Sequence, residues 1–177
     1  MRAPICTIDA SIVISLDHLD LLPQLSLLFS RVLIPKAVRT ELYKRRATKD
    51  RLQAILAAYT FIERCDSYEK GAVDLLLIER LAQGVADRGE AEAVVQAAEQ
   101  GAVVIVDDPW GRDLAERFDR DFHGTVWILR RFFELGLASA TATRSHFAVL
   151  FQRGIRLPWK VVDEFLTEIG ERALDDA

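Results

Sequence analysis

The stretch Val103-Val104-Ile105-Val106-Asp107-Asp108 runs from four apolar β-formers straight into two adjacent acids. A continuous apolar run this short, lying between Gly101 and Pro109, is typical of a fully buried strand in a parallel sheet. Open α/β sheets bind ligands at the carboxyl ends of their strands. Two neighbouring carboxylates at such an end repel each other unless a cation or a proton lies between them. The stretch therefore predicts a buried strand that ends at a ligand site.

The chain begins with the same pattern, a short apolar run that ends in an acid. Ile5-Cys6-Thr7-Ile8 is followed by Asp9-Ala10-Ser11, in which Ser11 is the expected N-cap of a short buried helix. Further short strands are expected at 32–34 and 61–62, and the chain after His123-Gly124-Thr125 is expected to be helical. Helices that alternate with buried strands predict an α/β fold with a parallel sheet and right-handed crossovers.

Composition indicates one globular domain, or one domain with a small appendage. The 177 residues are 50% hydrophobic and 28% charged, with a net charge of −4. This charge excludes a general polyanion binder, so nucleic acid would have to be held by a local basic patch or a metal. The most basic window, from Lys44 to Arg51, is either a solvated helix end or a patch that contacts phosphates.

Two further features bear on where the protein works. Cys6 and Cys65 are too few for a disulfide framework, which favours a reducing cytoplasmic setting. No apolar run reaches the roughly 18 residues that a membrane-spanning helix needs. We therefore expect a cytoplasmic protein with no membrane partner.

Acidic residues follow the predicted strands at positions that should meet in space. Asp9 and the pair Asp107 and Asp108 end strands, Glu41 lies on the helix after the second strand, and Glu90 begins the helix before the last strand. Each has an ordinary explanation as a helix cap, a first-turn charge or an exposed helix residue. Gathered at one sheet edge, however, they could not all ionise without compensation. A hard divalent cation, Mg²⁺ or Mn²⁺, is the usual solution.

The ordered set of motifs resembles the PIN-domain ribonucleases, and more narrowly the bacterial and archaeal PIN-like proteins often paired with an antitoxin. No single motif is specific, but their order across residues 5–154 is fairly specific. The matching pieces are Asp9-Ala10-Ser11, Ile34-Pro35 with Val38 and Glu41, Gly89-Glu90-Ala91-Glu92-Ala93, Val106-Asp107-Asp108 with Arg112, and Gly124-Thr125 before an apolar helix ending in Leu135-Gly136-Leu137.

The resemblance implies a fold and a chemistry. The fold would be a three-layer α/β/α PIN-like domain with a short central parallel sheet over residues 1–140, followed by a helical extension over residues 141–177 packed on the same domain. The chemistry would be Mg²⁺- or Mn²⁺-dependent cleavage of single-stranded RNA. The implied catalytic residues are Asp9, Glu41, Glu90, Asp107 and Asp108. Of these, Asp9, Glu90 and Asp108 would hold the metal, with the choice between Asp107 and Asp108 left open.

The resemblance also implies supporting residues and partners. Ser11 and Thr125 would hydrogen-bond to the acids, and Arg112 would contact the substrate phosphate, although a structural salt bridge explains Arg112 equally well. The partners would be RNA and a small antitoxin protein, with a homodimer suggested by the long apolar helices. The protein would then be the toxin of a toxin–antitoxin pair.

Other classes of function remain open at this point. A non-catalytic PIN-like adapter or nucleic-acid-binding protein would keep the fold with a vestigial acidic site. A receiver-type phosphotransfer domain would need an early acidic pair and a strand that ends in Lys, whereas the acidic pair here comes late. A haloacid-dehalogenase-like phosphatase would need a second acid two residues after Asp9, where Ser11 stands.

Overall fold

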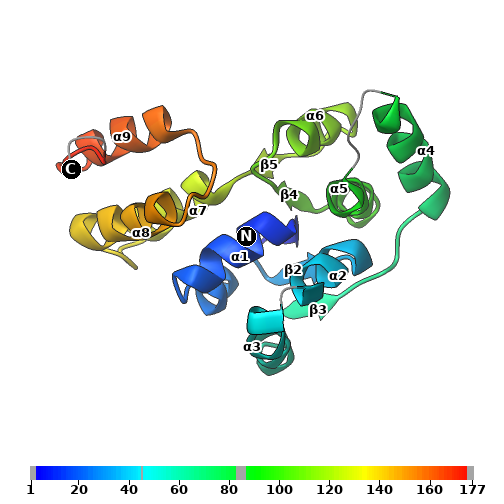
Figure 1. Ribbon diagram of the computed structural model, residues 1–177, viewed down its shortest axis with the longest axis horizontal. Helices are drawn as coiled ribbons and strands as arrows, with labels where there is room; N and C mark the ends of the chain where they lie inside the picture. Colours follow the sequence, from blue (N-terminus) through cyan, green and yellow to red (C-terminus); the bar gives the residue numbers. More distant parts are fainter. Residues whose placement is uncertain (1–2, 45, 83–86, 175–177) are drawn as a thin grey trace.

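A parallel sheet of five strands forms the centre of the molecule (Figure 1). The computed structural model describes residues 3–44, 46–82 and 87–174. The strand order is β3-β2-β1-β4-β5, so the two apolar runs that end in acids, β1 and β4, are paired neighbours. The strands are β1 (Ile5–Ile8), β2 (Arg31–Ile34), β3 (Ile62–Arg64), β4 (Val103–Ile105) and β5 (Phe122–His123).

Helices connect the strands and continue the chain beyond the sheet. They are α1 (Ala10–His18), the 3-10 helix η1 (Leu22–Leu27), α2 (Lys36–Lys44), α3 (Arg46–Ala58), α4 (Lys70–Leu81), α5 (Arg88–Gln100), α6 (Pro109–Arg117), α7 (Thr125–Glu134), α8 (Ala140–Gln152) and α9 (Trp159–Glu168). Figure 1 shows α4 at one end of the molecule and α8 and α9 at the other. None of the helices in the described part of the chain is both long and apolar enough to cross a membrane.

Two apolar clusters form the core, and alternate residues of the strands divide between them. Val104 and Val106 belong to a cluster with residues of α4, α5 and α6. Ile8 and Ile105 belong to the other cluster, with residues of α1, α2, α3, α7, α8 and α9. Because successive strand residues point to opposite faces, the two clusters lie on opposite sides of the sheet. The expected three-layer α/β/α fold is confirmed.

The C-terminal helices share their core with the N-terminal half of the chain. Phe147 of α8 and Phe165 of α9 are buried and meet edge to face, with ring centroids 6.4 Å apart. Both belong to the same cluster as Ile12 of α1. The loop between α8 and α9 is therefore held against the sheet domain, close to the end of β1.

Two local features differ from the expectation. Asp9 rather than Ser11 caps α1, because the Asp9 carboxylate accepts a hydrogen bond from the Ser11 backbone N–H at 3.0 Å. The second feature is β5, which the sequence did not predict. A strand of two residues is too short to show an alternation of apolar and polar side chains, and β5 is defined only by its pairing with β4.

Candidate active site

A cavity of about 550 Å³ lies at the carboxyl edge of the sheet. We call it the acidic cavity. Its acidic lining residues are Asp9, Glu41, Asp87, Glu90, Asp107 and Asp108. They come from the end of β1, from α2, from the start of α5 and from the loop between β4 and α6. Side chains far apart in the sequence, all but Asp87 expected at this edge, thus surround a single cavity.

Asp9 lies at the end of β1 and is only 6% exposed. Its Oδ2 accepts hydrogen bonds from the backbone N–H of Ser11 at 3.0 Å and from the Ser11 hydroxyl at 2.6 Å. Burial raises the pKa of Asp9, and these hydrogen bonds oppose that rise. Asp9 therefore serves as a helix cap and also lines the acidic cavity, so its two sequence-based explanations are compatible.

Glu90, in the first turn of α5, is a buried acid of the cavity. The residue is 7% exposed, and its Oε2 is buried without a hydrogen-bond partner. Burial raises the pKa of Glu90 to about 9, and repulsion from Asp108, Asp9 and Asp87 adds to the rise. A buried carboxylate oxygen with no donor and three acidic neighbours is a position that a cation would stabilise.

Asp107 is held by the N-terminus of α7. Its Oδ2 accepts a hydrogen bond from the Thr125 hydroxyl at 2.7 Å, and its Oδ1 accepts one from the Thr125 backbone N–H at 3.0 Å. Arg112 lies 3.6 Å from Oδ1. Burial raises the pKa of Asp107, while Thr125 and Arg112 lower it. A Cβ added at Gly124 would lie 2.2 Å from the Asp107 Oδ1, so only glycine permits this close packing.

Asp108 differs from its neighbour because it is exposed and caps α6. Its Oδ1 accepts a hydrogen bond from the Trp110 backbone N–H at 2.8 Å. It lines the acidic cavity, and its repulsion raises the pKa of Glu90 more than that of Asp9 or Asp87 does. Of the two acids, Asp107 is thus anchored to Thr125 and Arg112, whereas Asp108 faces Glu90.

Glu41 and Asp87 complete the ring of acids. Glu41 is half-buried on α2 and lines the cavity. Asp87 caps α5 by accepting hydrogen bonds from the backbone N–H groups of Gly89 at 2.7 Å and Glu90 at 3.3 Å. The sequence did not predict Asp87 as a site residue. Its position three residues before Glu90, at the same helix end, was the available signal.

Two arginines, Arg112 and Arg156, lie near the acids. Arg112 lies against Asp107 and over the Phe122 ring, at 5.9 Å from the ring centroid, and is not among the residues that line the acidic cavity. Arg156, in the loop between α8 and α9, does line it. No hydrogen bond or ion pair joins the Arg156 side chain to another of the described residues. Its guanidinium group is thus available to a phosphate.

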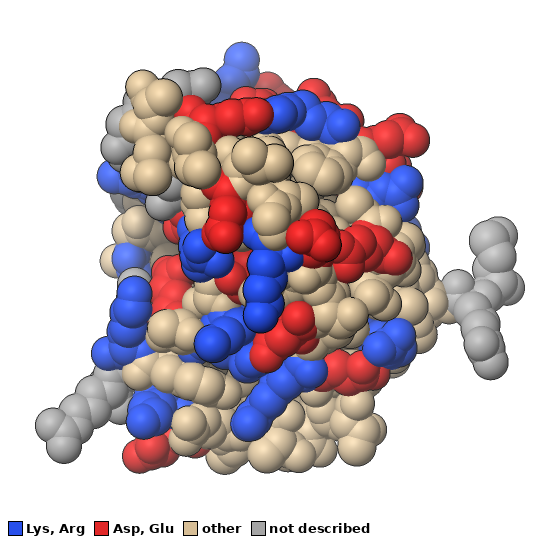
Figure 2. Space-filling view, turned by 90° about the vertical axis from the view of Figure 1, so that its right-hand side faces the viewer, with Lys and Arg blue, Asp and Glu red and all other residues tan. Residues whose placement is uncertain are grey.

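The basic residues between Lys44 and Arg51 do not share one environment in the structure. Arg51 pairs with Asp17 at 3.0 Å and with Asp20, so it ties α3 to α1. Lys44 is exposed at the end of α2, whereas Arg45 and the side chain of Arg46 lie outside the described residues. Figure 2 shows basic and acidic side chains interspersed over the face that carries α4, so no broad field of one sign covers it.

The donor set can be tested against a divalent cation. Among the described residues, no three Asp, Glu, His or Cys side chains are grouped closely enough to form a complete metal site as they lie. The acids instead surround a cavity of about 550 Å³, which suits Mg²⁺ because this ion keeps several of its waters and binds through one or two carboxylates. The Oε2 of Glu90, which is buried without a hydrogen-bond partner, would be stabilised by a cation. The residues therefore fit a hydrated Mg²⁺ or Mn²⁺.

The parallel sheet and the acids at its carboxyl edge define an α/β domain with a candidate site where open sheets bind ligands. A family model described as a PIN domain matches residues 5–171, and the chain belongs to that family. No curated protein matches the chain. The resemblance inferred from the ordered motifs is confirmed at the level of the family.

Proposed function

We propose that this protein is a Mg²⁺- or Mn²⁺-dependent ribonuclease that cleaves single-stranded RNA internally. The observation that supports this most directly is the buried Oε2 of Glu90, which has no donor and faces the charges of Asp9, Asp87 and Asp108. Membership of the PIN-domain family indicates a nuclease-type fold. Acids at a sheet edge that need a cation, on such a fold, suit phosphodiester hydrolysis.

In this proposal three of the acids bind the metal and a fourth orients the attacking water. Asp9, Glu90 and Asp108 would hold the metal directly or through its waters, because all three line the acidic cavity and the charges of Asp9 and Asp108 act on Glu90. When bound, Mg²⁺ or Mn²⁺ supplies an activated water and stabilises the charge that develops on the phosphate. Glu41, from the α2 side of the cavity, would orient the attacking water.

Other side chains would keep these acids in place. Ser11 fixes the orientation of the Asp9 carboxylate through two hydrogen bonds, and Thr125 does the same for Asp107. Arg156 would contact the non-bridging oxygens of the scissile phosphate, a role that its place in the cavity supports better than that of Arg112. Arg112 would act through Asp107, as a positioning residue.

The proposal is tested by Mn²⁺-dependent cleavage of a labelled single-stranded oligoribonucleotide, with EDTA as the metal-free control. Asp9→Asn is expected to abolish cleavage while circular dichroism shows an intact fold. Asp113→Asn, a matched change of an exposed acid on α6 outside the acidic cavity, is expected to leave cleavage unchanged. Full Mn²⁺-dependent activity of the Asp9→Asn variant would contradict the proposal.

We further propose that the nuclease is the toxin of a pair whose other member is a small antitoxin protein, working in the cytoplasm. The family resemblance supports this, and so do the exposed Leu75, Ile78 and Leu81 of α4, a face suited to another protein or a second copy. Expression without a partner is then expected to arrest growth, and expression of Asp9→Asn is not. Harmless accumulation of folded, active protein would contradict the toxin role.

A further inference from the structure

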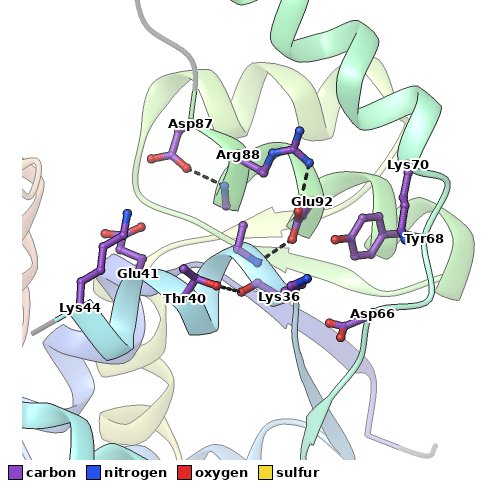
Figure 3. A pocket seen from close by; sticks show the side chains of 12 residues that line it. Lys36, Thr40, Glu41, Lys44, Asp66, Tyr68, Lys70, Asp87, Arg88 and Glu92 are labelled. Atoms are coloured by element: carbon purple, nitrogen blue, oxygen red, sulfur yellow. Dashed lines mark hydrogen bonds and ion pairs between the residues drawn. The ribbon is translucent and has the colours of Figure 1, made fainter.

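A second and larger cavity, of about 850 Å³, adjoins the acidic cavity. Figure 3 shows it between α2, the start of α5 and the segment that leads from β3 into α4. Glu41 and Asp87 line both cavities, so the two are continuous along one groove. A chain whose scissile phosphate lay in the acidic cavity would extend through this second space.

Three lysines give the second cavity its free positive charge. Lys36 and Lys44 stand at the two ends of α2, and Lys70 begins α4. All three are exposed, and no hydrogen bond or ion pair joins their ammonium groups to other side chains in the described parts of the chain. In Figure 3, Lys44 lies beside Glu41 on one side, Lys70 lies on the other, and Lys36 is between them.

Two of the acids and the arginine of this cavity already have partners. Asp66 accepts two hydrogen bonds from Arg39, each at 2.9 Å. Glu92 accepts the Ala37 backbone N–H at 2.7 Å and lies 3.5 Å from Arg88, which also binds Asp74. These acids are thus committed within the fold. The lysines are left to attract an external anion.

Tyr68 adds an aromatic surface to the cavity wall. The side chain is half-buried, and its hydroxyl points toward Glu92 (Figure 3). The ring packs in part against the core cluster formed by α4, α5 and α6, which fixes it without covering it completely. An aromatic ring beside free lysines is the usual combination for single-stranded nucleic acids, in which the bases stack and the phosphates pair with cations.

We propose that this second cavity binds the nucleotides that flank the scissile phosphate of a single-stranded RNA. Lys36, Lys44 and Lys70 contact its phosphates, and one base stacks on Tyr68. The inference rests on the proposed ribonuclease function, because continuity with the acidic cavity is what orders the strand. A duplex is disfavoured, since a base within a stacked helix cannot lie against Tyr68.

The test measures binding of a labelled single-stranded oligoribonucleotide to the full chain in EDTA, where metal-dependent cleavage is off. Lys36→Ala combined with Lys70→Ala is expected to reduce the slope of log K against log salt by about 1.4, or about 0.7 for each lost phosphate contact. Lys160→Ala, an exposed lysine on α9 at the other end of the molecule, is the matched control and should leave the slope unchanged.

Tyr68 is tested with two substitutions. Tyr68→Phe keeps the ring and is expected to keep the affinity, whereas Tyr68→Leu keeps apolar packing and should weaken binding about tenfold. Equal loss in both variants would show that the hydroxyl, and not stacking, matters, and would overturn the assignment of the ring. Thermal unfolding of both variants checks that the fold is intact.

Failure of the subsite and failure of the proposed function give different results. If Mn²⁺-dependent cleavage persists and the lysine double variant binds RNA as the wild type does, the subsite is wrong. If the lysines govern RNA binding but the wild type never cleaves with Mn²⁺, the ribonuclease function is wrong. A glutamate-rich peptide that displaces RNA at equal concentration would show that the cavity serves acidic protein segments instead, and would also overturn the subsite.

Discussion

Replacing Glu90 by glutamine should stabilise the metal-free protein, and increasingly so as the pH rises. The pKa of Glu90 is raised from 4.5 to about 9 in the folded protein, chiefly by burial. Between these values the unfolded chain carries an ionised Glu90 and the folded chain a protonated one. Folding then takes up a proton, so the stabilising contribution of the neutral carboxyl is complete below pH 4.5 and is lost as the pH approaches about 9.

The size of the effect follows from linkage. One proton taken up on folding changes the free energy of unfolding by about 1.4 kcal/mol per pH unit. Glutamine is neutral at every pH, so Glu90→Gln removes this dependence. The difference in the free energy of unfolding between Glu90→Gln and the wild type should grow by about 3 kcal/mol between about pH 6 and pH 8.

The assay is urea unfolding in EDTA at several pH values, followed by circular dichroism. Differences between the two proteins at each pH isolate Glu90, because other titrating groups are common to both. Glu116→Gln, the same change at an exposed position on α6, controls for the chemical substitution itself. If the free energy of unfolding changes with pH in the same way for the wild type and Glu90→Gln from pH 6 to pH 8, Glu90 is not protonated in the metal-free fold and the reasoning is refuted.

Three further changes probe the surroundings of the acids. Gly124→Ala would set a Cβ 2.2 Å from the Asp107 Oδ1 and 2.8 Å from an Arg112 nitrogen, so it should lower stability by about 1–3 kcal/mol in urea unfolding; wild-type stability would contradict this. Thr125→Val removes the hydroxyl that donates to Asp107 at 2.7 Å and should cost about 1–3 kcal/mol, with weaker Mn²⁺ binding in calorimetry; unchanged values for both would count against the positioning role. Arg156→Ala should lower kcat/KM for RNA at least tenfold without changing the melting temperature, and equal kinetics would exclude its contact with phosphate.

The sequence predicted those elements of the fold whose residues form a long or strongly apolar pattern. The apolar runs at β1 and β4 were predicted as buried strands that end in acids, and the structure pairs them as neighbours in the sheet. The strand β5 was not predicted, because two residues are too few to show the alternation of apolar and polar side chains that indicates a strand. For the cap of α1 the sequence offered both Ser11 and Asp9, and the structure selects Asp9, whose carboxylate accepts the Ser11 backbone N–H.

The acids of the site were predictable because topology alone brings strand ends and helix starts to one edge. The cations were not, since their places depend on contacts that no local pattern carries. Arg112 is one turn beyond the acidic pair, yet its side chain turns to Asp107 and Phe122. Arg156 lines the acidic cavity from the loop between α8 and α9, whose Phe147 and Phe165 share a core cluster with α1 through contacts between distant parts of the chain.

The central claim is that the acidic cavity holds a divalent cation. Its most direct test is a crystal of the protein grown with Mn²⁺, examined for anomalous scattering from the metal. We expect one strong peak bounded by Asp9, Glu90 and Asp108, and its loss in Glu90→Gln. An ordered cavity without a peak at saturating Mn²⁺, or a peak only at another place on the molecule, would contradict the account.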